Sequence, residues 1–147
     1  MSSEATRIDF YVLAAANSEA RLRFACRLAE KAVHLNNRVF ALTADEAAAR
    51  HLDELLWTFR AESFVPHGMA SATTTEALPV MIAFGADAPQ AQGDLLINLT
   101  PAVPACYESF ARVAEIIDSS DECRQQGRTR FSFYRNNGFE PQTHKIT

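Results

Sequence analysis

The chain has 147 residues, of which 48% are hydrophobic and 22% are charged, and its formal net charge is −4. These values predict a single soluble domain over residues 1–147, because no window approaches the roughly 20 apolar residues that a membrane span requires. The net charge argues against a protein that coats nucleic acid by bulk electrostatics, and the amino terminus lacks a secretory signal, so we expect a cytoplasmic location.

The first part of the chain alternates expected strands and helices. Residues Arg7–Leu13 are rich in β-forming side chains and predict a strand in the interior of a sheet. Ser18 is placed to cap a helix with apolar residues at three- and four-residue steps. Arg38–Leu42 predict a second strand, and Thr43–Glu46 has the Thr-x-x-Glu form of a capping box that opens a helix through about Leu56.

The middle of the chain predicts a loop and two buried strands. Ser71–Glu76 is polar and reads as a loop within the domain, and not as a linker. Pro79–Phe84 and Asp94–Leu99 are continuous apolar runs, which is the pattern of strands buried on both faces.

The last part of the chain predicts a strand between two helices. Pro104 can start a short helix, and Arg112–Ile117 predicts an edge strand, with helix continuation as the alternative. A final helix begins near Asp118 and ends near Arg135, before a left-handed stop at Gly138. The alternation predicts an α/β, Rossmann-like three-layer fold with a mainly parallel central sheet and helices on both faces.

The motifs of nucleotide, metal and nucleophile chemistry are missing from the sequence. The turn Ala14–Ser18 after the first expected strand has no glycine, and neither Gly-x-Gly-x-x-Gly nor a Walker motif occurs, so a nucleotide-using Rossmann-like enzyme stays an alternative only. The three cysteines are widely spaced, and Cys106 could be a reactive thiol at a helix start, although a buried apolar thiol is the simpler interpretation. The four histidines are scattered and read as surface or capping residues. We expect no metal, no cofactor and no catalytic residue.

A basic stripe on the last expected helix is the clearest candidate for binding. From Arg124 onward the chain has five basic residues and one acidic residue. Arg124, Arg128, Phe131 and Arg135 fall within a stripe of about 60° at ~100° per residue. Guanidinium groups around a ring suit an anionic segment with apolar side chains, which could be an acidic peptide or single-stranded nucleic acid. A solvated basic face with Phe131 turned inward is the alternative.

A second candidate is the aromatic stretch that follows the second helix. It carries Trp57, Phe59 and Phe64 where a loop is expected, and Pro66 stiffens it. These rings could fill the core, or they could form a surface for a partner, because interfaces are enriched in such residues.

These residues resemble one family in particular. Leu52-Asp53-Glu54-Leu55-Leu56-Trp57, followed by Glu62-Ser63-Phe64-Val65-Pro66-His67, is similar to the signature of the chi subunit of bacterial DNA polymerase III holoenzyme. The resemblance continues through Asp9-Phe10-Tyr11, Asp94-Leu95-Leu96-Ile97-Asn98-Leu99 and the closing Arg128-x-x-x-x-x-Tyr134-Arg135-x-x-Gly138-Phe139.

The resemblance implies a non-catalytic, monomeric adaptor of the clamp-loader complex in bacterial DNA replication. In this family, chi binds the psi subunit, and through it the clamp loader, on one surface. On another surface it binds the acidic tail of single-stranded DNA-binding protein, which ends in an apolar residue with a free carboxylate. Contact with DNA is then mainly indirect, and a direct single-stranded DNA-binding module is the alternative.

The resemblance also implies which residues make these contacts. The positions that match the psi-binding residues of the family are Trp57, Phe64, Val65 and Pro66. The positions that match the tail-binding residues are Arg124, Arg128, Phe131 and Thr143, with Arg128 as the expected partner of the tail carboxylate.

Overall fold

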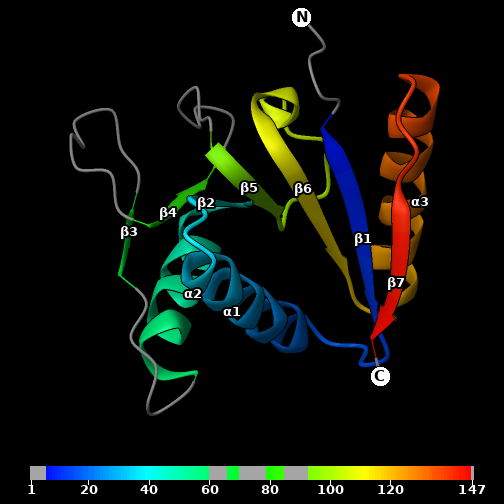
Figure 1. The fold of residues 1–147 in the computed structure, drawn as a ribbon. Coiled ribbons are helices and arrows are strands. Elements are labelled where there is room, and N and C mark those ends of the chain that lie inside the picture. The colour runs from blue at the N-terminus through cyan, green and yellow to red at the C-terminus, as the bar shows by residue number, and fades with distance from the viewer. Residues whose placement is uncertain (1–5, 60–65, 70–78, 85–92, 147) are drawn as a thin grey trace, which may run out of the picture.

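The fold is an α/β sandwich of three layers, shown in Figure 1. The computed structural model describes residues 6–59, 66–69, 79–84 and 93–146. The elements are, in chain order, β1 (Arg7–Leu13), α1 (Ser18–His34), β2 (Val39–Thr43), α2 (Glu46–Thr58), β3 (His67–Met69), β4 (Val80–Phe84), β5 (Gly93–Asn98), the 3-10 helix η1 (Tyr107–Ser109), β6 (Phe110–Ile117), α3 (Asp121–Asn136) and β7 (Gln142–Ile146).

The described strands form one parallel sheet of seven strands in the order β3-β4-β2-β5-β6-β1-β7. Parallel neighbours need crossover connections, and α1, α2 and α3 supply three of them. The predicted class is therefore confirmed, and the described sheet is wholly parallel. β3 and β7 are its two edges.

Helices lie on both faces of the sheet, as predicted. Ala25 of α1 and Leu52 of α2 pack with Ile97 on one face. Tyr134 of α3 packs with Phe10 and Val113 on the other face. Neighbouring residues of a strand point to opposite faces, so the apolar runs of β2, β5 and β6 contribute side chains to the hydrophobic cores on both faces of the sheet.

Both predicted helix caps shift to neighbouring residues. Asn17, and not Ser18, caps α1, because its Oδ1 accepts from the backbone N–H of Ala20 at 2.7 Å. Asp45 caps α2 in the same way, with 2.8 Å between Oδ1 and the N of Ala48. Thr43 is instead the buried last residue of β2, and its hydroxyl donates to the carbonyl of Ala83 at 2.9 Å, so the capping box is wrong.

The prediction of an edge strand at Arg112–Ile117 is also wrong. β6 runs from Phe110 to Ile117 between β5 and β1, and its last five residues are buried, as an interior strand requires. The short helix expected after Pro104 is only the 3-10 turn η1.

Two short strands at the edges of the sheet were not predicted. β3 lies inside the stretch read as an aromatic loop, and β7 is mostly polar. The predictions of a strand at Arg7–Leu13 and of a positive φ at Gly138 are confirmed, and Leu52, Leu55 and Leu56 of α2 are buried. The loop expected at Ser71–Glu76 lies outside the described residues. Among the described helices, none is long and apolar enough to cross a bilayer.

Candidate functional site

The basic stripe of α3 meets the edge strand β7 and forms one exposed surface. Phe131 is half-buried, and its ring centroid is 5.2 Å from that of Phe10 in β1. Phe10 is the register partner of Thr143 in β7, so Phe131 and Thr143 flank the same ring. We call this the α3–β7 surface, and it comprises the half-buried Phe131 and the exposed Arg124, Arg128, Arg135, Thr143 and Lys145.

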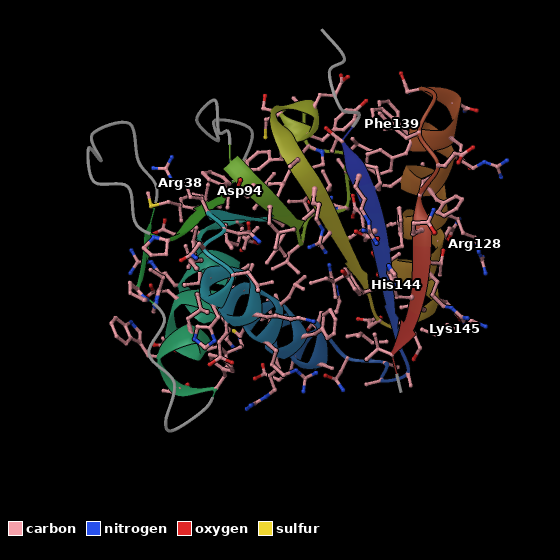
Figure 2. The ribbon with its side chains drawn as sticks, viewed as in Figure 1. Arg38, Asp94, Arg128, Phe139, His144 and Lys145 are labelled. Atoms are coloured by element: carbon pink, nitrogen blue, oxygen red, sulfur yellow. The ribbon has the colours of Figure 1, made fainter. Side chains whose placement is uncertain are left out.

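The cations of this surface are available to an anionic partner. Among the described residues, no ion pair includes Arg124, Arg128, Arg135 or Lys145. Figure 2 shows Arg128 of α3 and Lys145 of β7 on the same side of the molecule. The arginines are solvent-exposed, as both interpretations of the stripe expected. Phe131 is only half-buried, so it is not turned fully inward as the alternative interpretation required.

A buried polar network fixes α3 against the sheet. Glu115 of β6 accepts from Nε of Arg130 at 2.9 Å and from the hydroxyl of Tyr134 at 2.7 Å. The Nδ2 of Asn98 donates to both carboxylate oxygens, at 3.1 and 3.0 Å. Burial raises the pKa of Glu115, and the Arg130 guanidinium opposes that shift. Because every partner is hydrogen-bonded, the network can fix the rotation of α3 and so turn the arginine stripe towards β7.

A glycine lets α3 approach the sheet closely. A Cβ on Gly127 would lie 2.3 Å from Cδ1 of Ile117, which is too short for any real contact. The absence of a side chain at this position therefore leaves the space that the side chain of Ile117 in β6 occupies against α3. Arg124 and Arg128 lie on the same two turns of α3 as Gly127, and both are exposed.

Lys145 is the residue of this surface that sequence reasoning missed. It pairs with Val12 in register, two positions after Thr143, and so faces the same side of the sheet. The polar sequence Gln142–Ile146 gives no strand signal. The alternation of Thr143 and Lys145 would have placed them together only if β7 had been recognised.

The opposite edge of the sheet carries the second predicted surface. Trp57, near the end of α2, is 52% exposed, and its ring centroid is 4.5 Å from that of His67 in β3. Pro66 is half-buried and joins the sheet edge through its carbonyl, which accepts from the N–H of Val80 at 3.3 Å. Phe64 and Val65 lie outside the described residues. The structure therefore brings Trp57 and the β3 edge together.

His67 is not the surface or capping histidine that was expected. Its side chain is buried beneath Trp57, and its Nε2 lies 3.1 Å from the carbonyl oxygen of Asp53 and 3.2 Å from Oδ1 of the same residue. The histidine thus ties β3 to α2 and supports the indole ring. The spacing of 14 residues between His67 and Asp53 hides this contact in the sequence.

The remaining candidate chemistry is weaker. Among the described side chains, no group of three or more histidines, cysteines or acids is placed to hold a metal ion. Burial raises the pKa of the Cys106 thiol, which is the opposite of the lowered pKa expected of a reactive thiol at a helix start. The glycine-free turn after β1 is occupied by protein contacts, because the N–H of Ser119 donates to the carbonyl of Ala15 at 2.9 Å and its hydroxyl to that of Ala14 at 2.9 Å.

Comparison with known proteins gives a consistent set of relatives. Residues 5–142 match the family described as "DNA polymerase III chi subunit, HolC". The chain is 45% identical to DNA polymerase III subunit chi of Pseudomonas aeruginosa over 96% of this chain and 97% of that protein. It is 33% identical to the protein of the same name in Escherichia coli, over 80% of each chain.

A third relative and a solved structure complete the comparison. The subunit chi of Haemophilus influenzae is 28% identical over 94% of this chain and 96% of its own length. Among solved structures, the crystal structure of T4 UvsW superposes with a TM-score of 0.70 at 9% identity. That match covers 96% of this chain and 41% of the T4 chain, and at such low identity it shows a shared fold alone.

Proposed function

The chain belongs to the DNA polymerase III chi subunit family, and from this premise we propose that it links the psi subunit to the acidic tail of single-stranded DNA-binding protein. Its family makes it an accessory subunit in DNA replication. In the proposed role it is not catalytic by itself, and it reaches the clamp loader through psi. The polymerase reaction then belongs to other subunits of the complex.

The observation that carries the tail-binding proposal is the α3–β7 surface. It carries three exposed arginines and Lys145, together with the half-buried ring of Phe131 on the same helix as the arginines. A planar guanidinium can bind a terminal carboxylate through two hydrogen bonds, and the ring offers a seat for the apolar residue before it. We assign Arg128 to the carboxylate, Arg124 to the acidic side chains, and Phe131 with Thr143 to the last side chain of the tail.

The change Arg128→Ala tests this assignment. It should weaken the binding of a synthetic tail peptide by about 1.5–3 kcal/mol, the range for hydrogen bonds to charged groups. Isothermal titration calorimetry measures the loss. Arg50→Ala is the matched control, because Arg50 is an exposed arginine of α2 whose guanidinium already pairs with Glu46 at 2.6 Å. If wild type and Arg128→Ala bound the tail peptide with equal affinity, the tail-binding proposal would be wrong.

For psi we propose the opposite surface, formed by Trp57, Phe64, Val65 and Pro66. The support is the exposed indole of Trp57 at the end of α2, held by a buried histidine of the sheet edge. Large aromatic side chains presented in this way are typical hot spots of protein interfaces.

The change Trp57→Ala should weaken binding of purified psi by about 2 kcal/mol or more, as loss of an interface hot spot does. Surface plasmon resonance with immobilised psi measures it. Leu35→Ala is the control, because Leu35 is an exposed apolar residue at the end of α1, 64% accessible. If Trp57→Ala left psi binding intact, or abolished psi and tail binding together, the proposed interface would be wrong.

Direct binding of single-stranded DNA by the α3–β7 surface is the alternative function. The same free cations support it. An oligonucleotide should then bind with a steep salt dependence in the absence of any peptide, and the tail peptide should compete with it.

A further inference from the structure

A second cationic surface lies on the side of the sheet opposite α3. The register of β1 places Arg7 beside Arg112 of β6, and Tyr11 beside His144 of β7. Arg7 and Tyr11 are four residues apart on one strand, so both face the side of the sheet that carries α1. Figure 1 shows α1 leaving the carboxyl end of β1 towards β2, so this helix does not cover the beginning of β1.

Rings and cations alternate along this surface. The ring of Tyr11 stacks with that of His144, with 5.0 Å between centroids and 21° between planes, and lies 5.2 Å from that of Phe24 in α1. The guanidinium of Arg27 lies 5.7 Å above the Phe24 ring, and Nη2 of Arg112 donates to the Tyr11 hydroxyl at 3.0 Å. We call this continuous set the β1 face, and it comprises Arg7, Tyr11, Phe24, Arg27, Arg112 and His144.

The buried carboxylate of Asp9 lies beneath the β1 face, close to one side-chain nitrogen each of Arg7, Arg112 and His144. Asp9 is fully buried, and its Oδ1 lies 3.2 Å from Nε of Arg7 and 2.9 Å from Nε2 of His144. The Nε of Arg112 lies 3.5 Å from Oδ2. Within the described parts of the chain, the Nη atoms of Arg7 make no hydrogen bond or ion pair, and its side chain is 59% accessible. Asp9 thus orients Arg7 by its Nε and leaves the outer edge of that guanidinium available for a ligand, whereas Nη2 of Arg112 already donates to the Tyr11 hydroxyl.

We propose that the β1 face binds single-stranded nucleic acid. Arg7, Arg27 and Arg112 would contact phosphates, because the guanidinium fork suits phosphate oxygens. The partly exposed ring of His144, which stacks on the half-buried Tyr11, would lie against a base, since rings between cations form the usual platform for unpaired bases. A peptide of acidic residues alone would use the charges but not the stacked rings. The net charge of −4 limits this binding to the local surface, in contrast to coating by the whole protein.

A titration of the full chain with fluorescently labelled oligothymidine, followed by anisotropy at several salt concentrations, tests the proposal. Arg7→Gln and Arg27→Gln change exposed side chains, and each should weaken binding about fivefold or more. Each should also lower the slope of log affinity against log salt by about 0.7, the value for one phosphate contact on a single strand. Tyr11→Leu should weaken binding and leave the slope unchanged, because it removes stacking and no charge.

Two controls separate the β1 face from the α3–β7 surface. Arg128→Ala and Arg50→Gln should leave oligothymidine affinity unchanged, while Arg7→Gln and Arg27→Gln should leave tail-peptide affinity unchanged. The proposal is overturned if no salt-dependent binding occurs, or if Arg128→Ala abolishes it while Arg7→Gln and Arg27→Gln do not. It is also overturned if polyglutamate, and not oligothymidine, binds in an Arg7-dependent way. None of the results that overturn the proposal depends on whether the tail peptide binds.

Discussion

Two arginines of the same helix turn have opposite environments. Arg128 is exposed on the α3–β7 surface, whereas Arg130 is 3% exposed and paired with the buried Glu115. Residues two apart on a helix point to opposite sides, so the stripe containing Arg128 could be read from spacing. The role of Arg130 could not, because its partner lies 15 residues away on another element. Removing one member of such a pair leaves a buried charge, so Arg130 is a positioning residue for the surface.

The residues of the candidate site also differ in how well the sequence predicts them, depending on whether their partners are near or far along the chain. Local spacing placed Arg124, Arg128 and Phe131 on one face of a helix. The contact of Trp57 with His67 depends on β3, and the position of Lys145 on the same side as Thr143 depends on β7. Neither strand has a clear sequence signal, because β3 is short and β7 is mostly polar. Pairing between segments far apart in the sequence therefore determines which of these residues lie together, and local patterns do not predict it.

The buried thiol of Cys26 predicts a loss of stability at alkaline pH. Desolvation raises its pKa from 9.0 to about 12 in the folded protein. The folded state therefore holds this proton more tightly than the unfolded chain, so the stability it contributes is present below pH 9.0 and is lost as the pH rises towards about 12. Between these values the slope is about 1.4 kcal/mol per pH unit. Urea unfolding of wild type and Cys26→Ala at several alkaline pH values should show a smaller slope for the variant; equal slopes would contradict the prediction.

At the scale of elements, long periodic segments were predictable and their ends were not. The apolar runs of β1, β4 and β5 and the helical spacing of α1, α2 and α3 are strong local signals. The caps moved by one or two residues: Asn17 caps α1 in place of Ser18, and Asp45 caps α2 because Thr43 is a buried residue of β2. β6 was placed at an edge because Arg112–Ile117 alternates polar and apolar residues, although Arg112 is used on the β1 face and Glu115 in the buried network.

The close approach of α3 to β6 gives a prediction for Gly127. Gly127→Ala would gain about 1 kcal/mol of helix propensity but would place Cβ against Cδ1 of Ile117. Overpacking of this kind costs about 1–3 kcal/mol, so the free energy of unfolding should fall in urea denaturation. The double variant Gly127→Ala with Ile117→Val removes the clashing methyl and should recover most of the loss. A double variant no more stable than Gly127→Ala would show that the contact is not the cause.

At the scale of the molecule, the strand order separates the two proposed protein-binding surfaces. Trp57 lies over β3 and the α3–β7 surface lies over β7, and these strands are the opposite edges of the sheet. The order of strands is set by packing of whole crossover units and cannot be read from local patterns. This arrangement is what a bridging subunit needs, because two partners can dock without touching each other.

Separation at opposite edges predicts that the two binding events are independent. The tail peptide should bind the free chain and the chain saturated with psi with affinities that agree within about 0.5 kcal/mol, the usual additivity of distant sites. Trp57→Ala should leave peptide binding unchanged, and Arg128→Ala should leave psi binding unchanged, because their surfaces share no element. Calorimetric titration of the peptide into both forms measures the coupling directly. A coupling energy above about 1 kcal/mol, or displacement of one partner by the other, would mean that the surfaces communicate or overlap.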